Sequence, residues 1–231
     1  MPKAVVRGVT AGALGGFLVF EGKRITGQVG AGHGLGYAYV ARATASVGVS
    51  LMENAAAGRG LFSQAHMDVG FVRVDVSRTA APIRFRLLPS SLISTAIFAR
   101  RFNLNWSRTL ETGGIVFDTR DGSDGSGETL ANVIAVVDSP DHFETDPRLA
   151  HELVHSLQFE DFAALTYFFQ PLATEWNASH RTLGRFLYPD FIEFGALRLR
   201  YDVIEGGRAE YCRNYLEQEA NALGHRASAC P

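Results

Sequence analysis

Two histidines and a glutamate in the segment "LAHELVHSLQ", residues 149–158, have the types and spacing of a metal-binding motif. His151 and His155 stand four positions apart, so a helix would place both imidazoles on one face. Zinc binds imidazole nitrogens at about 2.0 to 2.1 Å, and two histidines one turn apart can converge on one ion. Glu152, directly after the first histidine, could then accept a proton from a metal-bound water. An activated water of this kind attacks amide carbonyls.

The residues around this motif predict the helix that the motif requires. Asp146 followed by Pro147 is typical of a helix start, because aspartate caps free N–H groups and proline is tolerated in the first turn. Apolar residues then recur at helical spacing and predict a stripe that packs on the rest of the molecule: Ala150, Leu153, Val154 and Leu157. The alternative, a surface helix with two unrelated histidines, does not account for this context.

A catalytic zinc site needs a third protein ligand and one open position, whereas a structural site has four protein ligands. Asp161 is the local candidate for the third ligand, six residues after His155. It would follow the metzincin pattern H-x-x-G-x-x-H, whose glycine lets the chain turn back to the metal. This chain has Gln158 in place of that glycine, and all three of its methionines lie upstream of the motif. We therefore expect Asp161 to be a solvated carboxylate near the helix end.

The other candidate for the third ligand lies far from the histidines in the sequence, in "YLEQEANALG", residues 215–224, where the apolar residues again follow helical spacing. Glu217 and Asn221 stand four positions apart on one face of this predicted helix. A glutamate ligand followed one turn later by a polar group is an arrangement in which the second group can orient a ligating histidine. Glu219 points to another side of the helix, so both glutamates cannot serve equally. The alternative for Glu217 is an exposed helical glutamate.

The two motifs together, "HELVHSLQ" and "EQEANALG", resemble the zincin metallopeptidases of the gluzincin type. They are especially similar to small bacterial domains that carry an HELxHxxQ helix and a later E-x-E-A motif. The resemblance implies that His151, His155 and Glu217 bind zinc, that Glu152 is the general base and that Asn221 orients a ligand. Two departures are a gap of about sixty residues between the motifs and an asparagine where many relatives have aspartate.

The resemblance also implies a strand beside the metal, on which a peptide substrate pairs by β-addition. The segments "GGIVFD" (113–118) and "NVIAVVD" (132–138) are equal candidates for that strand, and the tract "DGSDGSGE" (121–128) between them favours a surface loop. A tyrosine or histidine often stabilises the oxyanion in such sites. Four residues could do so, and the pattern does not rank them: His180, Tyr201, Tyr211 and His225.

The pattern along the chain predicts an α+β fold. Glycine- and valine-rich alternating segments such as 36–51 and 70–78 predict strands, whereas helical periodicity dominates after about residue 145. We expect a β-rich region over 1–140, with the substrate-side strand near its end, packed against a helical zinc-binding region over 141–231. The two regions together are expected to form one composite domain.

Composition excludes several other classes of protein. The 22 basic and 24 acidic residues give a net charge of −2 without a basic stripe, so nucleic acid is not an expected partner. The N-terminus lacks a convincing signal peptide, and no apolar run reaches the roughly 18 residues of a stable membrane span. The location stays open: soluble, or in the cell envelope if the chain is part of a longer precursor. Cys212 and Cys230 allow one disulfide at most and exclude a cysteine-based zinc module.

These observations predict a zinc-dependent hydrolase that cleaves peptide bonds in a peptide or protein substrate. The alternative from another class is a non-enzymatic β-rich binding or envelope module whose zinc site is structural or vestigial. A third possibility is a regulatory metallopeptidase with one dedicated protein substrate. An open coordination position facing Glu152 is the feature that would separate an enzyme from a binding module.

Overall fold

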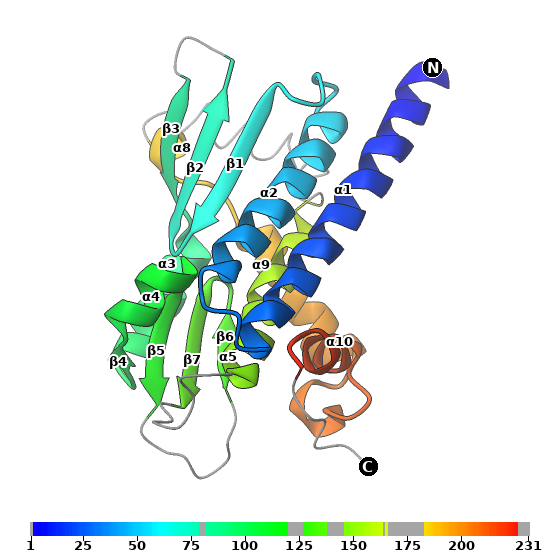
Figure 1. Ribbon diagram of the computed structural model, residues 1–231. Coiled ribbons are helices and arrows are strands. Elements are labelled where there is room, and N and C mark those ends of the chain that lie inside the picture. Colours follow the sequence, from blue (N-terminus) through cyan, green and yellow to red (C-terminus); the bar gives the residue numbers. More distant parts are fainter. Residues whose placement is uncertain are drawn as a thin grey trace.

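The computed structural model combines helices with two separate β-sheets, which confirms the predicted α+β class (Figure 1). A pair of long helices comes first, two sheets with flanking helices follow, and shorter helices complete the C-terminal part. The residues that the structure describes are 2–78, 82–119, 127–137, 146–163, 165 and 183–225. Most of the glycine-rich tract that was expected to be a loop, 121–126, lies outside these ranges.

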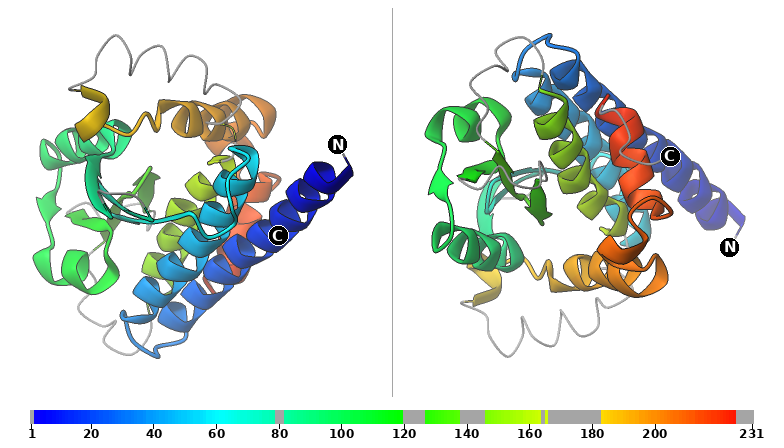
Figure 2. Two further views of the ribbon diagram at one scale, coloured as in Figure 1. Left: turned by 90° about the horizontal axis from the view of Figure 1, so that it is seen from above. Right: turned by 90° about the horizontal axis from the view of Figure 1, so that it is seen from below.

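The first two elements are helices, α1 (Pro2–Gly30) and α2 (Tyr37–Ala56), which lie side by side (Figures 1 and 2). The prediction of strands over 36–51 is therefore wrong. The β-rich character expected for region 1–140 begins only at Gln64, where the first strand starts.

Small residues explain both this packing and the wrong prediction. Ala41, Ala45 and Gly48 recur at helical spacing on the buried face of α2. A Cβ atom added to Gly48 would lie 2.4 Å from the carbonyl oxygen of Gly15, and one added to Gly22 would lie 2.7 Å from that of Ala41. Glycine has a low helix propensity, but here it lets two helix backbones approach closely.

The Gly48→Ala variant is expected to lose about 1–3 kcal/mol of unfolding free energy, because the new methyl group meets the α1 backbone. Gly16→Ala is the matched control, since a Cβ atom there meets nothing within 4 Å. The control should be unchanged or gain up to about 1 kcal/mol from the better helix propensity of alanine. Thermal unfolding followed by circular dichroism measures both, and equal stability of the two variants would contradict the close packing.

Helix α1 is apolar on two sides. One side packs on α2, while Val6, Val9 and Phe17 are exposed at 64%, 68% and 57% on another. The segment Val5–Gly30 is long and apolar enough to cross a membrane by length and composition, a test that core helices also pass. The prediction of no stable membrane span therefore stays a prediction.

The first sheet is an antiparallel meander of β1 (Gln64–Val69), β2 (Val72–Ser77) and β3 (Ile83–Leu87). Strand β2 confirms the strand predicted over 70–78. Its alternation places the charged residues Arg73 and Asp75 inside, while Val76 is half exposed.

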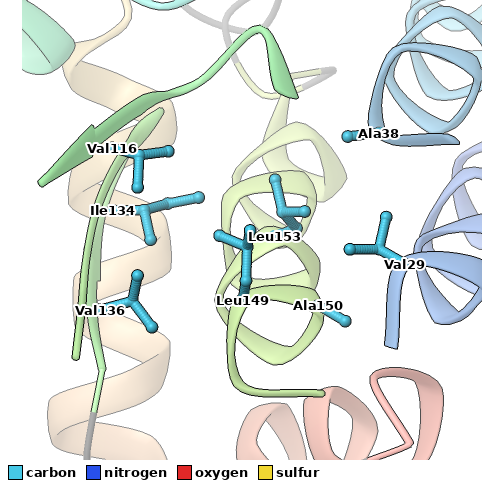
Figure 3. Packing of buried hydrophobic residues seen from close by; sticks show 8 residues of the cluster. All are labelled: Val29, Ala38, Val116, Ile134, Val136, Leu149, Ala150 and Leu153. Carbon is cyan, nitrogen blue, oxygen red and sulfur yellow. The ribbon is translucent and has the colours of Figure 1, made fainter. Parts of the chain in front are cut away.

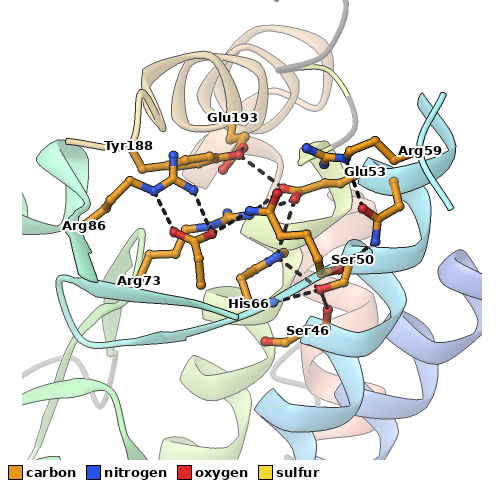
Figure 4. A network of polar contacts seen from close by, with 12 residues as sticks. Ser46, Ser50, Glu53, Arg59, His66, Arg73, Arg86, Tyr188 and Glu193 are labelled. Carbon is orange, nitrogen blue, oxygen red and sulfur yellow. Dashed lines mark hydrogen bonds and ion pairs between the residues drawn. The ribbon is translucent and has the colours of Figure 1, made fainter. Parts of the chain in front are cut away.

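Buried charges of this sheet form ion pairs with Glu53 of α2 and with one another, and Tyr188 packs against one of the guanidinium groups (Figure 4). Arg73 donates to both carboxylate oxygens of Glu53 at 2.7 and 2.8 Å, and its guanidinium lies 3.9 Å from the centre of the Tyr188 ring. Arg86 donates to Asp75 at 2.6 Å. Because removing one partner would leave an unpaired buried charge, these pairs fix how the sheet docks on α2.

The second sheet has the order β4-β5-β7-β6, in which β5 (Ile115–Thr119) and β7 (Val133–Val137) are parallel neighbours. These two strands confirm the predictions from "GGIVFD" and "NVIAVVD". The outer strands β4 (Asn103–Leu104) and β6 (Glu128–Leu130) are antiparallel to their neighbours. Helices α3 (Pro89–Ala99) and α4 (Trp106–Thr112) flank this sheet.

A hydrophobic core lies between this sheet and α5 (Pro147–Gln158), with α1 on the far side of α5 (Figure 3). Its members include Val116, Ile134, Leu149, Leu153 and Val29. The apolar stripe predicted for α5 is fully buried: Ala150, Leu153, Val154 and Leu157. Burial of this stripe fixes the rotation of α5 about its axis and thereby the direction of its histidines.

The C-terminal part consists of short helices that lead back to α5. They are η1 (Phe159–Phe162), α8 (Leu183–Phe186), α9 (Phe191–Arg198), the π-helix η2 (Leu199–Ile204), η3 (Gly207–Glu210) and α10 (Tyr215–Leu223). Cys212, between η3 and α10, is disulfide-bonded, and the other cysteine of the chain, Cys230, lies outside the described residues.

Candidate metal centre

Capped helix starts position the motif residues on α5 and α10. The Asp146 side chain accepts a hydrogen bond from the backbone N–H of Leu149 at 2.9 Å, as the sequence predicts. Asn214 caps α10 by accepting from the N–H groups of Leu216 and Glu217. The α10 end lies against α5 at Gly224, where a Cβ atom would be 2.7 Å from the backbone nitrogen of His151. The two helices therefore meet at the motif.

Three side-chain atoms converge between these helices. His151 Nε2 and His155 Nε2 lie 3.0 Å apart, and each lies 3.3 Å from Oε2 of Glu217. Ligands 2.0 to 2.1 Å from a tetrahedral zinc ion would be about 3.3 Å apart, so the triangle has the size that zinc requires. Among the described residues, these three form the group whose donor atoms could hold a metal ion. Two imidazoles and one carboxylate are a donor set that suits zinc.

Two other candidate ligands lie elsewhere. Asp161 and Glu219 each contact the Lys23 ammonium of α1 at 2.9 Å, so both carboxylates are held in ion pairs with this lysine. Asp161 was expected to be a solvated carboxylate near the helix end, and it is an exposed residue just after α5; the structure adds its ion pair with the buried Lys23.

Glu152 lies beside the triangle, with Oε1 3.9 Å from Nε2 of His151. The Thr129 hydroxyl donates to Oε2 of Glu152 at 2.7 Å. Gly127 gives the carboxylate room, because a Cβ atom there would lie 2.2 Å from Oε1. The general base predicted from the motif is thus held by the chain around β6 and is not one of the three converging donors.

Strand β7, one of the two expected candidates, packs against α5, but the strand that lines the cavity is β6, which neither candidate segment contains. Residues 127–131 line the cavity in front of the histidines, and β6 is the outer strand of the described sheet. Strand β6 could not be predicted from the sequence, because it has only three residues and begins at the end of the glycine-rich tract.

A cavity of about 730 Å³ opens on the three converging donors and Glu152. Its walls are both apolar and polar, and include Leu130, Phe194, Leu197, Tyr201, Arg208 and Tyr211. The cavity leaves space for a water molecule and part of a substrate next to the donors.

The cavity contains two of the four residues that could stabilise an oxyanion. The Tyr201 hydroxyl donates to Oε1 of Glu217 at 2.6 Å, and burial together with this bond raises the pKa of Tyr201 above its ordinary value. Tyr211 is hydrogen-bonded to Asn221. His225 does not line the cavity, and His180 lies outside the described residues.

Asn221 does not make the contact that the resemblance implied. Its amide and the Tyr211 hydroxyl are hydrogen-bonded at 3.2 Å, and Nδ1 of His151 has no partner within the described part of the chain. The residue that contacts a histidine is Gln158, whose Oε1 lies 2.8 Å from Nδ1 of His155. The sequence indicated Gln158 as the last residue of the HELxHxxQ pattern and as the replacement of the metzincin glycine, but not as the partner of His155.

The electrostatics of the triangle favour a cation. Burial opposes the charged form of His155, but its hydrogen bond to Glu217 and the charges of Glu152 and Glu217 raise its pKa to about 9. Burial likewise opposes the charged form of Glu217, but hydrogen bonds from His151 and His155 lower its pKa below the ordinary range. A divalent ion would take the place of the proton that these groups hold.

Comparison of the chain with protein-family models, with curated proteins and with solved structures finds no match. The function is therefore argued from the geometry of this centre.

Proposed function

We propose that the protein is a zinc-dependent metallopeptidase, with His151, His155 and Glu217 as ligands and Glu152 as general base. The observation that carries the proposal is the triangle of donor atoms 3.0 to 3.3 Å apart, which has the size of a three-ligand zinc site. The resemblance to gluzincins supports the same four roles.

The roles of the side chains follow from their positions. Zinc bound by the triangle would supply an activated water and polarise the carbonyl to be attacked. Glu152 would act as the base that accepts a proton from water and passes it to the leaving amine, and Thr129 holds its carboxylate in place. Tyr201 fixes Glu217 through its second oxygen. An extended peptide would pair with the outer edge of β6, and its backbone would then run through the cavity past the three donor atoms.

The alternative is a non-enzymatic module with a structural or vestigial zinc site. A structural site is closed by four protein ligands. Here Glu152 lies next to the triangle without joining it, and a cavity faces the fourth position. These two features favour an enzyme. A regulatory metallopeptidase with one dedicated substrate would have the same geometry, so substrate choice separates it from a general peptidase.

An assay on unfolded proteins and peptide libraries tests the proposal. We expect cleavage of peptide bonds by the zinc-loaded chain, complete loss after strong chelation and recovery when zinc is restored, because the water is activated only at the metal. Mass spectrometry of the products measures cleavage and its position. Cleavage that persists without any bound metal would contradict the proposal.

A further inference from the structure

Lys23 occupies an unusual position. It is one of two lysines in the chain and is 4% exposed, on the side of α1 that faces the zinc-binding helices. Its ammonium lies 2.9 Å from Glu219 of α10 and 2.9 Å from Asp161 of η1. Burial opposes its charge, but these two carboxylates raise its pKa, so it is a fixed cation between three elements.

Gln158 connects the Lys23–Glu219 ion pair to His155, a proposed zinc ligand. The Gln158 amide nitrogen donates to Oε2 of Glu219 at 2.8 Å and to the backbone oxygen of Leu216 at 2.9 Å. Since a carboxylate and a carbonyl can only accept, these bonds identify the nitrogen end of the amide. Its oxygen must then face His155.

This orientation determines the tautomer of His155. The Gln158 oxygen lies 2.8 Å from Nδ1 of His155 and can only accept, so Nδ1 carries the proton. Metal binding requires the neutral ring, in which Nε2 would present its lone pair to the space between the three donor atoms. A hydrogen bond of this kind fixes ring orientation and raises ligand basicity.

Helix α1 packs closely against α5 and α10 (Figure 2). A Cβ atom added to Gly27 would lie 2.6 Å from the backbone oxygen of Leu223 on α10. One added to Gly30 would lie 2.4 Å from the oxygen of Gly224 and 3.2 Å from Cβ of Ala150 on α5. Helix α1 therefore touches α5 and α10 where the two meet.

We propose that Lys23, Glu219 and Gln158 form a relay that positions His155 and makes metal affinity depend on the docking of α1. This inference rests on the proposed zinc site and assigns the orienting role to residues other than Asn221. Lys23 and Glu219 do not line the cavity, whereas Gln158 does. None of the three is one of the converging donors, and Gln158 reaches them through its bond to His155, so all three are positioning residues. Helix α1, distant from the motif in sequence, becomes part of the metal centre.

Zinc affinity, measured by competition with a chromophoric chelator, tests the relay in the full chain. Gln158→Leu should weaken zinc binding about 10- to 100-fold, because it removes the acceptor for Nδ1 of His155. Lys23→Met should weaken it in the same direction, and Lys23→Arg should restore most of the loss. Asp161→Asn is the matched control: it removes the charge of the other partner of Lys23 and should change the affinity less than about threefold.

Two further measurements make the result specific. The d–d absorption of the cobalt-substituted protein should shift in Gln158→Leu and stay unchanged in Asp161→Asn, which a general loss of stability would not produce. Long-range ¹H–¹⁵N NMR of the zinc-loaded wild-type protein should show the single ring proton of His155 on Nδ1, so the test stands even if a variant fails to fold.

Three results would overturn the relay: a proton on Nε2 of His155 in the zinc-loaded protein, wild-type zinc affinity in Gln158→Leu, or equal losses in Lys23→Met and Asp161→Asn. In each case the chain would still bind zinc, so the proposed function would stand. A wild-type chain that binds no zinc would instead overturn the proposed function and the relay with it.

Discussion

Peptide hydrolysis by the Glu152→Gln variant is expected to fall about 100- to 10,000-fold, which is the range that general acid–base catalysis contributes. The amide has nearly the size of the carboxylate and can still accept the hydrogen bond from Thr129. It cannot accept a proton from water at neutral pH. Because Glu152 is not a member of the triangle, the variant should bind zinc as the wild type does.

Initial rates on one cleaved peptide, together with zinc content, measure this effect. Thr129→Val is an informative companion, since it keeps the carboxylate but removes the group that holds it. Its rate should fall by less than that of Glu152→Gln. Unchanged hydrolysis by zinc-loaded Glu152→Gln would mean that another group takes the proton.

Loss of the third ligand gives the second large effect. Glu217→Ala should lower zinc affinity by more than about 100-fold, because groups that only orient a ligand already contribute 10- to 100-fold. The two histidines remain but lose the carboxylate that lies 3.3 Å from each. Competition with a chelator of known affinity measures the change.

Gln218→Ala is the matched control for this experiment, because it lies next to Glu217 on α10 with its side chain exposed. It should bind zinc as tightly as the wild type. Wild-type affinity in Glu217→Ala would place the third ligand on another residue, and Asp161 and Glu219 would then have to leave their ion pairs with Lys23.

The sequence was informative wherever chemistry depends on residues close together in the chain. The histidines one turn apart, the Asp146 cap and the apolar stripe of α5 are local properties, and all of them are present in the structure. The motif on α10 likewise indicated Glu217. The fold brings this residue next to the two histidines, although it lies 62 positions after His155.

Features that depend on packing between distant segments could not be predicted. The small residues of α2 favoured an interpretation as strands, because their role becomes clear only when Gly15 of α1 lies against Gly48. Gln158 bonds to Glu219 because α10 packs on α5, and Asp161 pairs with Lys23, which lies 138 positions away in the sequence. The sequence indicates which side chains can bond, but the fold decides which of them meet.

The most direct test of the central claim is the zinc content of the purified wild-type chain, measured by elemental analysis after dialysis against a weak chelator. The account predicts one zinc per chain, held by His151, His155 and Glu217. A chain that keeps no zinc under these conditions, while its folded structure is intact, would contradict it.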